Sequence, residues 1–311
     1  MGGVLDFGAY VVYIIRMRSI VLILIAFVGV LGWAIAAGSV EPVVEAHSRA
    51  DSALVTYLTT FWNQHQNYVR PTPFQDIASA DYWKYALSLH TIAEAVERTS
   101  GGRYWGWMET LYEWQDVRGW SRGYYDDETW MVMALVKCFT LNGDPKFLKT
   151  AVSLFDDVMN AWDETCCGSV PGGVWWDAKH TSKATASNAG PALASAQMYL
   201  ATANHTYLSF SEQTFRFWYT NMVNHSSGQV FDHINAQDGS IVTWRFTYNE
   251  GLMLHAALLL HNITADNFYL ECAHLIAGFM LSAELCDSAL GTVLSDAPDC
   301  TGDCDEFKHP A

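Results

Sequence analysis

Hydrophobic and polar positions follow a helical period along most of the chain after residue 37. Residues 146–160 show this well, because their apolar positions fall on one face of a helix and their polar positions on the other. The apolar face consists of Phe147, Leu148, Ala151, Leu154, Phe155, Val158 and Met159. No convincing run of strict apolar and polar alternation predicts a major sheet. The pattern therefore predicts an all-α protein.

A short motif recurs along the chain and indicates repeated helical hairpins. Phe147-Leu148, Tyr207-Leu208 and Tyr269-Leu270 each open an amphipathic helix after a polar turn, at spacings of 60 and 62 residues. Repetition of this kind is typical of stacked hairpins, none of which buries its apolar face alone. We expect a first helix at 48–63, followed by hairpins at 81–98/103–115, 127–141/146–162, 187–202/207–223 and 249–262/266–282.

The N-terminal region has the parts of a secretory signal. Arg16-Met17-Arg18 precedes an apolar run over 19–37 that ends in small residues, with cleavage expected after Ala36. The run is also long enough to span a bilayer, so an uncleaved membrane anchor over 19–37 stays open as the alternative. We treat 1–36 as an extension with a signal and 37–311 as the folded domain, and we expect secretion.

Charge and motif content exclude several classes of partner. The chain carries 33 acidic and 17 basic residues, a formal charge of −16, which would repel phosphate backbones and argues against nucleic acid. It has no Gly-rich nucleotide motif and no Cys/His spacing typical of zinc. We therefore expect no cofactor and no metal.

Sequons and cysteines fit an oxidising compartment. Sequons begin at Asn204, Asn224 and Asn262, which suits a secreted glycoprotein. The seven cysteines should pair in part. We expect Cys138 to be a buried free thiol, and the late group of Cys286, Cys300 and Cys304 to staple a loop.

Asp126 and Asp127 stand directly before an apolar helix over 131–141. One interpretation is structural, because Asp is a favoured N-cap and first-turn acids complement the helix dipole. The other is catalytic. Retaining cleavage of a glycosidic bond needs two carboxyl groups about 5–5.5 Å apart, one ionised and one protonated. A helix N-terminus favours the ionised carboxylate, and the neighbouring charge keeps the proton on the other group. A second pair, Asp156 and Asp157, lies on a polar helix face and receives no role.

Aromatic residues flank the first aspartate pair. Tyr124, Tyr125 and Trp130 could offer flat faces on which a sugar ring stacks.

Three segments carry a resemblance to a known family. They are Tyr125-Asp126-Asp127-Glu128-Thr129-Trp130, Trp162-Asp163 followed by Gly172-Gly173-Val174-Trp175-Trp176, and Thr243-Trp244 followed by Thr247-Tyr248-Asn249-Glu250-Gly251. Together and in this order they resemble glycoside hydrolase family 76, the endo-α-1,6-mannanases of bacteria and fungi. The resemblance implies an (α/α)6 toroid of twelve helices with the site in a central groove, and a retaining double displacement on α-mannan or a cell-wall glycan.

The resemblance also implies residue roles. By position, Asp126 is the nucleophile and Asp127 the general acid/base, and the segments that line the family's groove contain Trp175, Trp176, Tyr248 and Asn249. Glu250 departs from the usual Gln of the family. The family continues with further helices after a Phe-Lys pair, which here is Phe307-Lys308, so we expect about nine of twelve helices and an incomplete toroid.

The leading hypothesis is a secreted, monomeric glycosidase acting on α-1,6-linked mannan. A wall transglycosylase would use the same covalent intermediate. A catalytically incompetent glycan-binding or cell-wall structural protein is the alternative of a different class. A sugar isomerase would need a His acid/base, and no pattern favours His180, His233 or His255 for that role.

Overall fold

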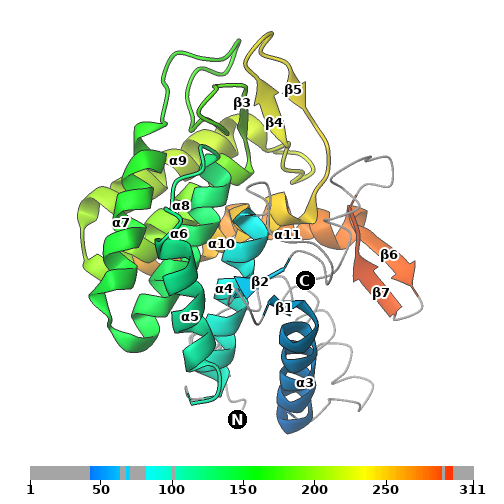
Figure 1. The fold of residues 1–311 in the computed structure, drawn as a ribbon. Coiled ribbons are helices and arrows are strands. Elements are labelled where there is room, and N and C mark those ends of the chain that lie inside the picture. The colour runs from blue at the N-terminus through cyan, green and yellow to red at the C-terminus, as the bar shows by residue number, and fades with distance from the viewer. Residues whose placement is uncertain (1–42, 64–67, 71–81, 100–101, 289–290, 297–311) are drawn as a thin grey trace, which may run out of the picture. The chain divides into compact units, whose positions relative to one another are not determined.

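Helices account for most of the described chain, which in this computed structural model comprises residues 43–63, 68–70, 82–99, 102–288 and 291–296 (Figure 1). Within those ranges there are nine: α3 (Val43–Phe61), α4 (Tyr82–Arg98), α5 (Trp105–Asp116), α6 (Tyr125–Asn142), α7 (Pro145–Asn160), α8 (Ala186–Thr202), α9 (His205–Met222), α10 (Thr247–Thr264) and α11 (Asn267–Ala283). Every end lies within five residues of its sequence-based prediction. The all-α fold and the hairpins are confirmed.

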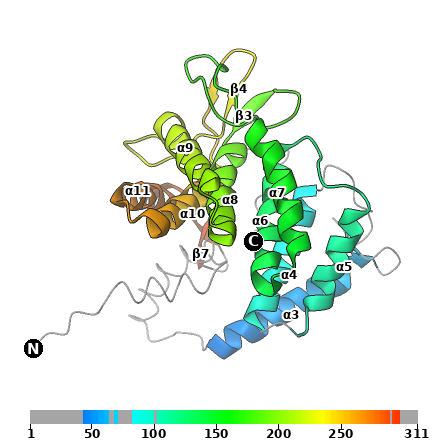
Figure 2. The same ribbon diagram turned by 90° about the vertical axis from the view of Figure 1, so that its left-hand side faces the viewer.

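The helices form an inner and an outer row. Helices α4, α6, α8 and α10 pack against one another in that order, while α7, α9 and α11 each pack on the inner helix before them (Figure 2). The outer helix α7 buries a single apolar stripe. The inner helix α6, by contrast, buries nearly every residue from Asp127 to Cys138. Helices that are apolar on all sides belong in the middle of a fold, and amphipathic ones cover them.

The turns between inner and outer helices repeat in detail. Helices α6, α8 and α10 end at left-handed C-caps, Gly143 (φ 71°), Ala203 (φ 57°) and Ala265 (φ 57°). The next helices have the N-caps Asp144, Asn204 and Asp266, whose side chains accept hydrogen bonds from the amides of Lys146, Thr206 and Phe268. The repeated turns of the sequence therefore adopt one geometry: a left-handed stop followed by a side-chain N-cap.

Short strands join the helices. They are β1 (Trp62–Asn63) with β2 (Tyr68–Val69), β3 (Ser182–Ala184) with β4 (His233–Asn235) and β5 (Ile241–Val242), and β6 (Leu285–Ser288) with β7 (Gly291–Leu294), all antiparallel. Strand β3 leads into α8, and the β4–β5 hairpin leads into α10 (Figure 1). The three-stranded sheet is therefore made by the connections that enter inner helices.

The cysteines differ in part from the prediction. Cys138 is buried and free, as predicted. Cys286 is free and exposed, so its expected disulfide is wrong; β6 is held by strand pairing instead, with Cys286 opposite Val293. Its proposed partners at 300 and 304 lie outside the described residues. Within the described residues, a disulfide joins Cys166 to Cys167.

The proposed signal or anchor over 19–37 also lies outside the described residues, so it stays a prediction. Among the residues that are described, none of the helices has the length and apolar character needed to cross a bilayer.

Candidate active site

The N-termini of the inner helices gather the candidate residues. Because each inner helix follows an outer helix that runs back along it, α6, α8 and α10 start at the same end of the row. Asp126 and Asp127 lie in the first turn of α6, and Tyr248 and Asn249 lie in the first turn of α10. This end carries the positive poles of the helix dipoles, which favour negative charge.

The start of α6 is not capped by the aspartates. Its N-cap is Tyr124, in extended conformation (φ −123°, ψ 113°) and without a side-chain cap. The loop before it is held by Glu128, whose Oε1 accepts hydrogen bonds from Ser121 Oγ (2.7 Å), Arg122 N (2.8 Å) and Gly123 N (3.1 Å). The expectation that an aspartate caps α6 is therefore wrong, but both aspartates lie in its first turn, where acidic side chains complement the helix dipole as the structural interpretation also expected.

Asp126 is half-buried and well supplied with donors. Its Oδ2 accepts a hydrogen bond from Trp176 Nε1 at 2.8 Å, and its Oδ1 accepts one from the amide of Asp127 at 2.9 Å. Burial raises the pKa of Asp126 to about 6, and these two hydrogen bonds oppose that rise by stabilising the carboxylate. The indole is brought there by the main chain, since Tyr125 N donates to Trp176 O at 2.9 Å.

Asp127 is in a different environment. Its side chain is 9% exposed, and its carboxyl group accepts no hydrogen bond from the described residues. Burial, together with the negative charges of Asp126 and Glu128, raises the pKa of Asp127 to about 8. Asp126 therefore ionises before Asp127. The pair can hold one carboxylate and one carboxylic acid near neutral pH, the combination that two-carboxylate chemistry requires.

The predicted aromatic residues divide into two groups. Tyr125 and Trp130 are half-buried on α6, and Trp130 lies one turn beyond Asp126 on the same helix face. Trp176 is also half-buried and meets Tyr124 edge-on, with ring centroids 5.2 Å apart.

Trp175 has a different position from its neighbour. It is 6% exposed and lies stacked on the ring of His180, with centroids 4.5 Å apart. Lys183 Nζ lies 4.7 Å from the Trp175 ring centre. The side chain therefore packs inside the layer that supports Trp176 and presents no open face.

The first turn of α10 carries two further predicted site residues, Tyr248 and Asn249. Burial raises the pKa of Tyr248 well above its usual range, and the negative charges of Asp232 and Asp126 add to the rise. Asn249 has no exposed surface and donates from Nδ2 to Asp232 Oδ1 at 2.9 Å. Sequence reasoning missed Asp232, because its contact with Asn249 forms only when two separate segments come together.

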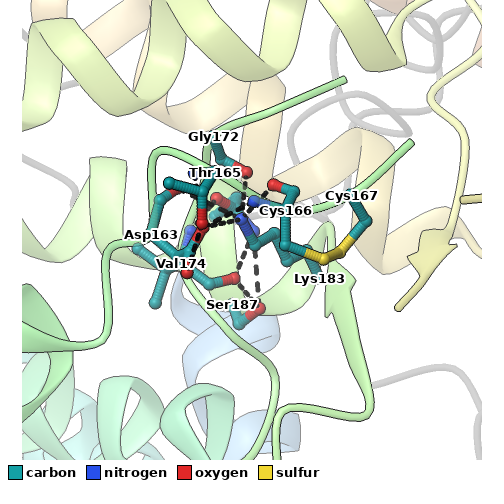
Figure 3. A network of polar contacts seen from close by, with 9 residues as sticks. Asp163, Thr165, Cys166, Cys167, Gly172, Val174, Lys183 and Ser187 are labelled. Atoms are coloured by element: carbon teal, nitrogen blue, oxygen red, sulfur yellow. Dashed lines mark hydrogen bonds and ion pairs between the residues drawn. A yellow bond between two sulfur atoms is a disulfide. The ribbon is translucent and has the colours of Figure 1, made fainter. Parts of the chain in front are cut away.

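A buried lysine organises the loop that carries Trp176 (Figure 3). Lys183 is fully buried, and its Nζ donates to the carbonyl oxygens of Cys166 (2.5 Å), Gly172 (2.6 Å) and Asp163 (3.1 Å). It also lies 3.4 Å from the Asp163 carboxylate. Burial opposes ionisation of Asp163, but hydrogen bonds from the amides of Cys166 and Thr165, with the Lys183 charge, lower its pKa to about 2. Lys183 is a further site residue that sequence reasoning missed.

No cluster of three or more His, Cys, Asp or Glu side chains in the described part of the chain is arranged to hold a metal ion.

Residues 45–310 match the sequence model of Glycosyl hydrolase family 76. The chain belongs to this family. The predicted resemblance is thus confirmed over most of the sequence.

Two curated relatives carry the same printed name. The chain is 26% identical over 135 residues to mannan endo-1,6-alpha-mannosidase DCW1 of Saccharomyces cerevisiae, which covers 40% of this chain and 29% of that protein. It is 25% identical over 211 residues to DCW1 of Eremothecium gossypii, covering 61% of this chain and 44% of that one. The chain spans less than half the length of these relatives.

Solved structures share the fold. The GH76A α-1,6-mannanase of Salegentibacter sp. HEL1_6 matches with a TM-score of 0.75 and 24% identity, over 84% of this chain and 76% of that one. A variant of it with two adjacent aspartates changed to asparagine is described as inactive and is bound to α-1,6-mannotriose (TM-score 0.74, 23% identity, same coverage). Dfg5 of Chaetomium thermophilum, in complex with glucosamine, matches with a TM-score of 0.60 and 19% identity, over 85% and 70% of the two chains. These likenesses confirm the α/α toroid fold class.

Proposed function

We propose that this chain is a retaining glycoside hydrolase that cleaves α-1,6-mannosidic bonds, with Asp126 as nucleophile and Asp127 as general acid/base. The observation that carries the proposal is the unequal environment of two adjacent carboxyl groups at one helix start: Asp126 accepts two hydrogen bonds, and buried Asp127 accepts none from the described residues. Support comes from the Salegentibacter enzyme, in which loss of two adjacent aspartates accompanies inactivity.

The chemistry runs in two displacements. In the first, Asp127 gives its proton to the glycosidic oxygen while the bond from that oxygen to the anomeric carbon breaks. Ionised Asp126 attacks the same carbon and forms a glycosyl-enzyme ester. In the second, Asp127, now a carboxylate, takes a proton from water, and the resulting hydroxide displaces Asp126. A sugar hydroxyl in place of water would give transglycosylation from the same intermediate.

The aromatic residues receive two kinds of role in this proposal. Tyr125, Trp130 and Trp176 are half-buried around Asp126 and would contact the sugar directly. Trp175 and Asn249 are buried, so they would act by holding Trp176 and Asp232 in place. The charges of Asp232 and Asp126 both raise the pKa of Tyr248, and this phenol would face the sugar next to the nucleophile.

We further propose that the substrate is α-mannan or a related cell-wall glycan, met outside the cell by a monomeric protein. The three sequons and the signal-like segment over 19–37 support secretion, and anchoring by that segment is the alternative. The proposed substrate is neutral, which suits a protein with a formal charge of −16.

The test is reducing-end release from linear α-1,6-mannan by purified protein. Asp126→Asn and Asp127→Asn should each lower kcat by about 10³-fold or more, because each removes a group that acts in the transition state. Asp156→Asn is the matched control: Asp156 is exposed on α7, and this variant should keep full activity. Equal activity of wild type and Asp126→Asn would overturn the assignment.

A second measurement separates the roles of the two residues. With an α-mannoside that carries an activated leaving group, Asp127→Asn should accumulate a covalent mannosyl adduct on Asp126, detectable by mass spectrometry. Binding of mannan without any product from the wild type would favour the glycan-binding alternative instead.

A further inference from the structure

The side chain of Asn188 holds a buried stretch of main chain that leads to Trp176. Asn188 lies in the first turn of α8 and has no exposed surface. Its Oδ1 accepts a hydrogen bond from the amide of Val174 at 2.8 Å, and its Nδ2 donates to the carbonyl oxygen of the same residue at 3.0 Å. One side-chain amide therefore pairs with both polar main-chain groups of Val174, as a residue in a neighbouring strand would.

The other edge of this stretch is paired with main chain. Val174 forms an antiparallel bridge with Trp162, and Asp163 N donates to Gly173 O at 3.0 Å. Val174 is itself buried, so a chain without the Asn188 side chain would leave the Val174 amide unpaired in the interior. The hydrogen bonds of Asn188 therefore complete the pairing of this segment on both edges.

Gly173 leaves room for the contact. Its φ of 93° lies in the range that favours glycine, and a Cβ at this position would lie only 2.9 Å from Asn188 Oδ1. The second glycine of the Gly172-Gly173 pair in the sequence is therefore explained by the close approach of the main chain to this side-chain amide.

Asn188 holds both ends of the segment that carries Trp176. Its Nδ2 also donates to Ala184 O at 2.8 Å, so Val174 and Ala184 are joined through one amide group. Ser187 Oγ lies 3.2 Å from Val174 O (Figure 3) and 3.1 Å from Ala184 O, and supports the same two carbonyl groups. Between these ends, the main-chain amide of Trp176 bonds back to β3. The segment is therefore a closed loop fixed to the start of α8.

We infer that Asn188 is a positioning residue for the proposed reaction, because it fixes the loop that directs the Trp176 indole at Asp126. Beyond Val174, the indole Nε1 donates to Asp126 Oδ2 at 2.8 Å, and Trp176 O accepts a hydrogen bond from Tyr125 N at 2.9 Å. Asn188 is fully buried, so it acts through Trp176 and does not contact the sugar. This inference rests on the proposed function, in which Asp126 is the nucleophile.

The ionisation of Asp126 reports on the indole without any substrate. In an Asp127→Asn parent, Asp126 titrates without its neighbour, and NMR of ¹³C-labelled aspartate carboxyl groups follows its pKa. Asn188→Ser in this parent cannot pair with both main-chain groups of Val174, so the indole is held less firmly. The pKa of Asp126 should then rise by about 0.5–1 pH unit. The acid limb of the kcat/KM profile should move the same way in a chain that keeps Asp127.

A second parent tests the route through Trp176. With Trp176→Phe the indole donor is already absent, so adding Asn188→Ser should not raise the pKa of Asp126 further. The other titratable groups that interact with Asp126 are Asp127, Asp177 and Tyr248. A rise that persists in the Trp176→Phe parent would mean that Asn188 acts through one of these groups, and it overturns the inference.

Ser195→Ala is the matched control. Ser195 is also fully buried, about two turns further along α8, and its Oγ donates to Tyr207 O at 2.6 Å. The variant therefore breaks a buried hydrogen bond of the same helix and leaves the Trp176 loop untouched. It should lower the unfolding temperature and leave the pKa of Asp126 unchanged.

Ser187→Ala is the milder variant and keeps the test valid where Asn188→Ser does not fold. It removes only the hydroxyl that lies near Val174 O and Ala184 O, and Asn188 stays in place. The pKa of Asp126 should rise in the same direction by a smaller amount. Thermal unfolding of each variant checks the fold.

Each outcome decides one point. An unchanged Asp126 pKa in folded Asn188→Ser, or in Ser187→Ala where the first variant does not fold, overturns the inference and leaves the proposed reaction standing. A rise of equal size in Ser195→Ala overturns it too, because any loosening of α8 would then suffice. The expected rise, found with a wild type that releases no reducing ends from α-1,6-mannan, keeps the control of the indole by Asn188 and overturns the proposed hydrolysis.

Discussion

The two carboxyl groups of the site differ because of one indole and one amide. Trp176 Nε1 and the amide of Asp127 both donate to Asp126, and each hydrogen bond favours the ionised form of that group. Asp127 has no such donor among the described residues and sits beside two negative charges. The division of labour between nucleophile and acid therefore depends on the position of Trp176.

Trp176→Phe tests this dependence. The variant keeps an aromatic ring but loses the donor, so the pKa of Asp126 should rise further. A hydrogen bond to a charged group is worth about 1.5–3 kcal/mol, so the acid limb of the kcat/KM profile on α-1,6-mannan should move up by about one to two pH units. Trp107 lies in the first turn of α5 and packs on Trp62, so Trp107→Phe should leave the limb where it is. A limb that does not move in Trp176→Phe would mean that the indole does not set the ionisation of Asp126.

Some of these residues could be found from sequence and others could not. Asp126 and Asp127 stand out because they are adjacent and precede an apolar helix. Asp232 and Lys183 do not, because their partners, Asn249 and Asp163, are brought to them only by folding. The local sequence around Asp232 and Lys183 also does not indicate that these side chains are buried.

Two tryptophans show how little local sequence says about exposure. Trp175 and Trp244 both lie in Trp-containing family segments, yet Trp175 is 6% exposed and Trp244 is 56% exposed. Tertiary packing decides this difference. No pattern in the sequence indicates that the Trp175 ring stacks on His180, so sequence reasoning assigned Trp175 to sugar binding.

The repeated helix ends give a prediction about stability. Ala203 and Ala265 occupy left-handed C-caps, where a Cβ is unfavourable, and both are exposed, so replacement removes no packing. Ala203→Gly and Ala265→Gly should each raise the free energy of unfolding by about 0.5–1 kcal/mol. Urea denaturation measures it. The converse control is Gly143→Ala at the equivalent position of α6, where a Cβ would meet no neighbour, and it should destabilise by a similar amount.

The loop between α7 and α8 depends on Lys183. Its ammonium group is fully buried and holds three carbonyl oxygens and the Asp163 carboxylate (Figure 3). Lys183→Met would leave these acceptors and a charge without their partner, so it should cost about 3–5 kcal/mol in urea unfolding. Lys149→Met, at an exposed position of α7, should cost less than about 0.5 kcal/mol. A small loss in Lys183→Met would show that water replaces the ammonium group there.

At the scale of the whole molecule, the fold could be predicted where the same sequence pattern recurs. Helix periodicity predicts the nine helices of the described residues, and three of the four hairpins also share the same left-handed stop. The β3–β4–β5 sheet was not predicted, since strands of two or three residues are too short to show an alternating pattern. Yet this sheet supports Trp176, so the part of the fold with the weakest sequence signal helps to position the site.

Three carboxyl groups outside the aspartate pair are buried in the folded protein. Glu250 and Glu284 are 0% and 3% exposed, and Asp296 is 5% exposed. Both carboxyl oxygens of Glu284, and Oε2 of Glu250, lack hydrogen-bond partners in the part of the chain that the structure describes. Burial, with the charge of Asp296 added, raises the pKa of Glu284 to about 7, and burial together with Glu284 raises the pKa of Glu250 well above its usual range.

Raised carboxyl pKa values set the sign of the pH dependence of stability. The folded protein binds more protons than the unfolded chain between the unfolded pKa near 4 and the folded values, so unfolding free energy should fall as pH rises through this interval. We expect the wild type to be more stable at pH 5 than at pH 8 in urea titrations. Glu250→Gln, which introduces the usual residue of the family, removes one of these groups. It should gain at least about 1 kcal/mol over wild type at pH 8 and little at pH 4.5. Asp156→Asn, at an exposed site, should follow the wild-type curve. If Glu250→Gln keeps the wild-type slope between pH 5 and pH 8, Glu250 is ionised in the folded protein at a cost that its surroundings already offset.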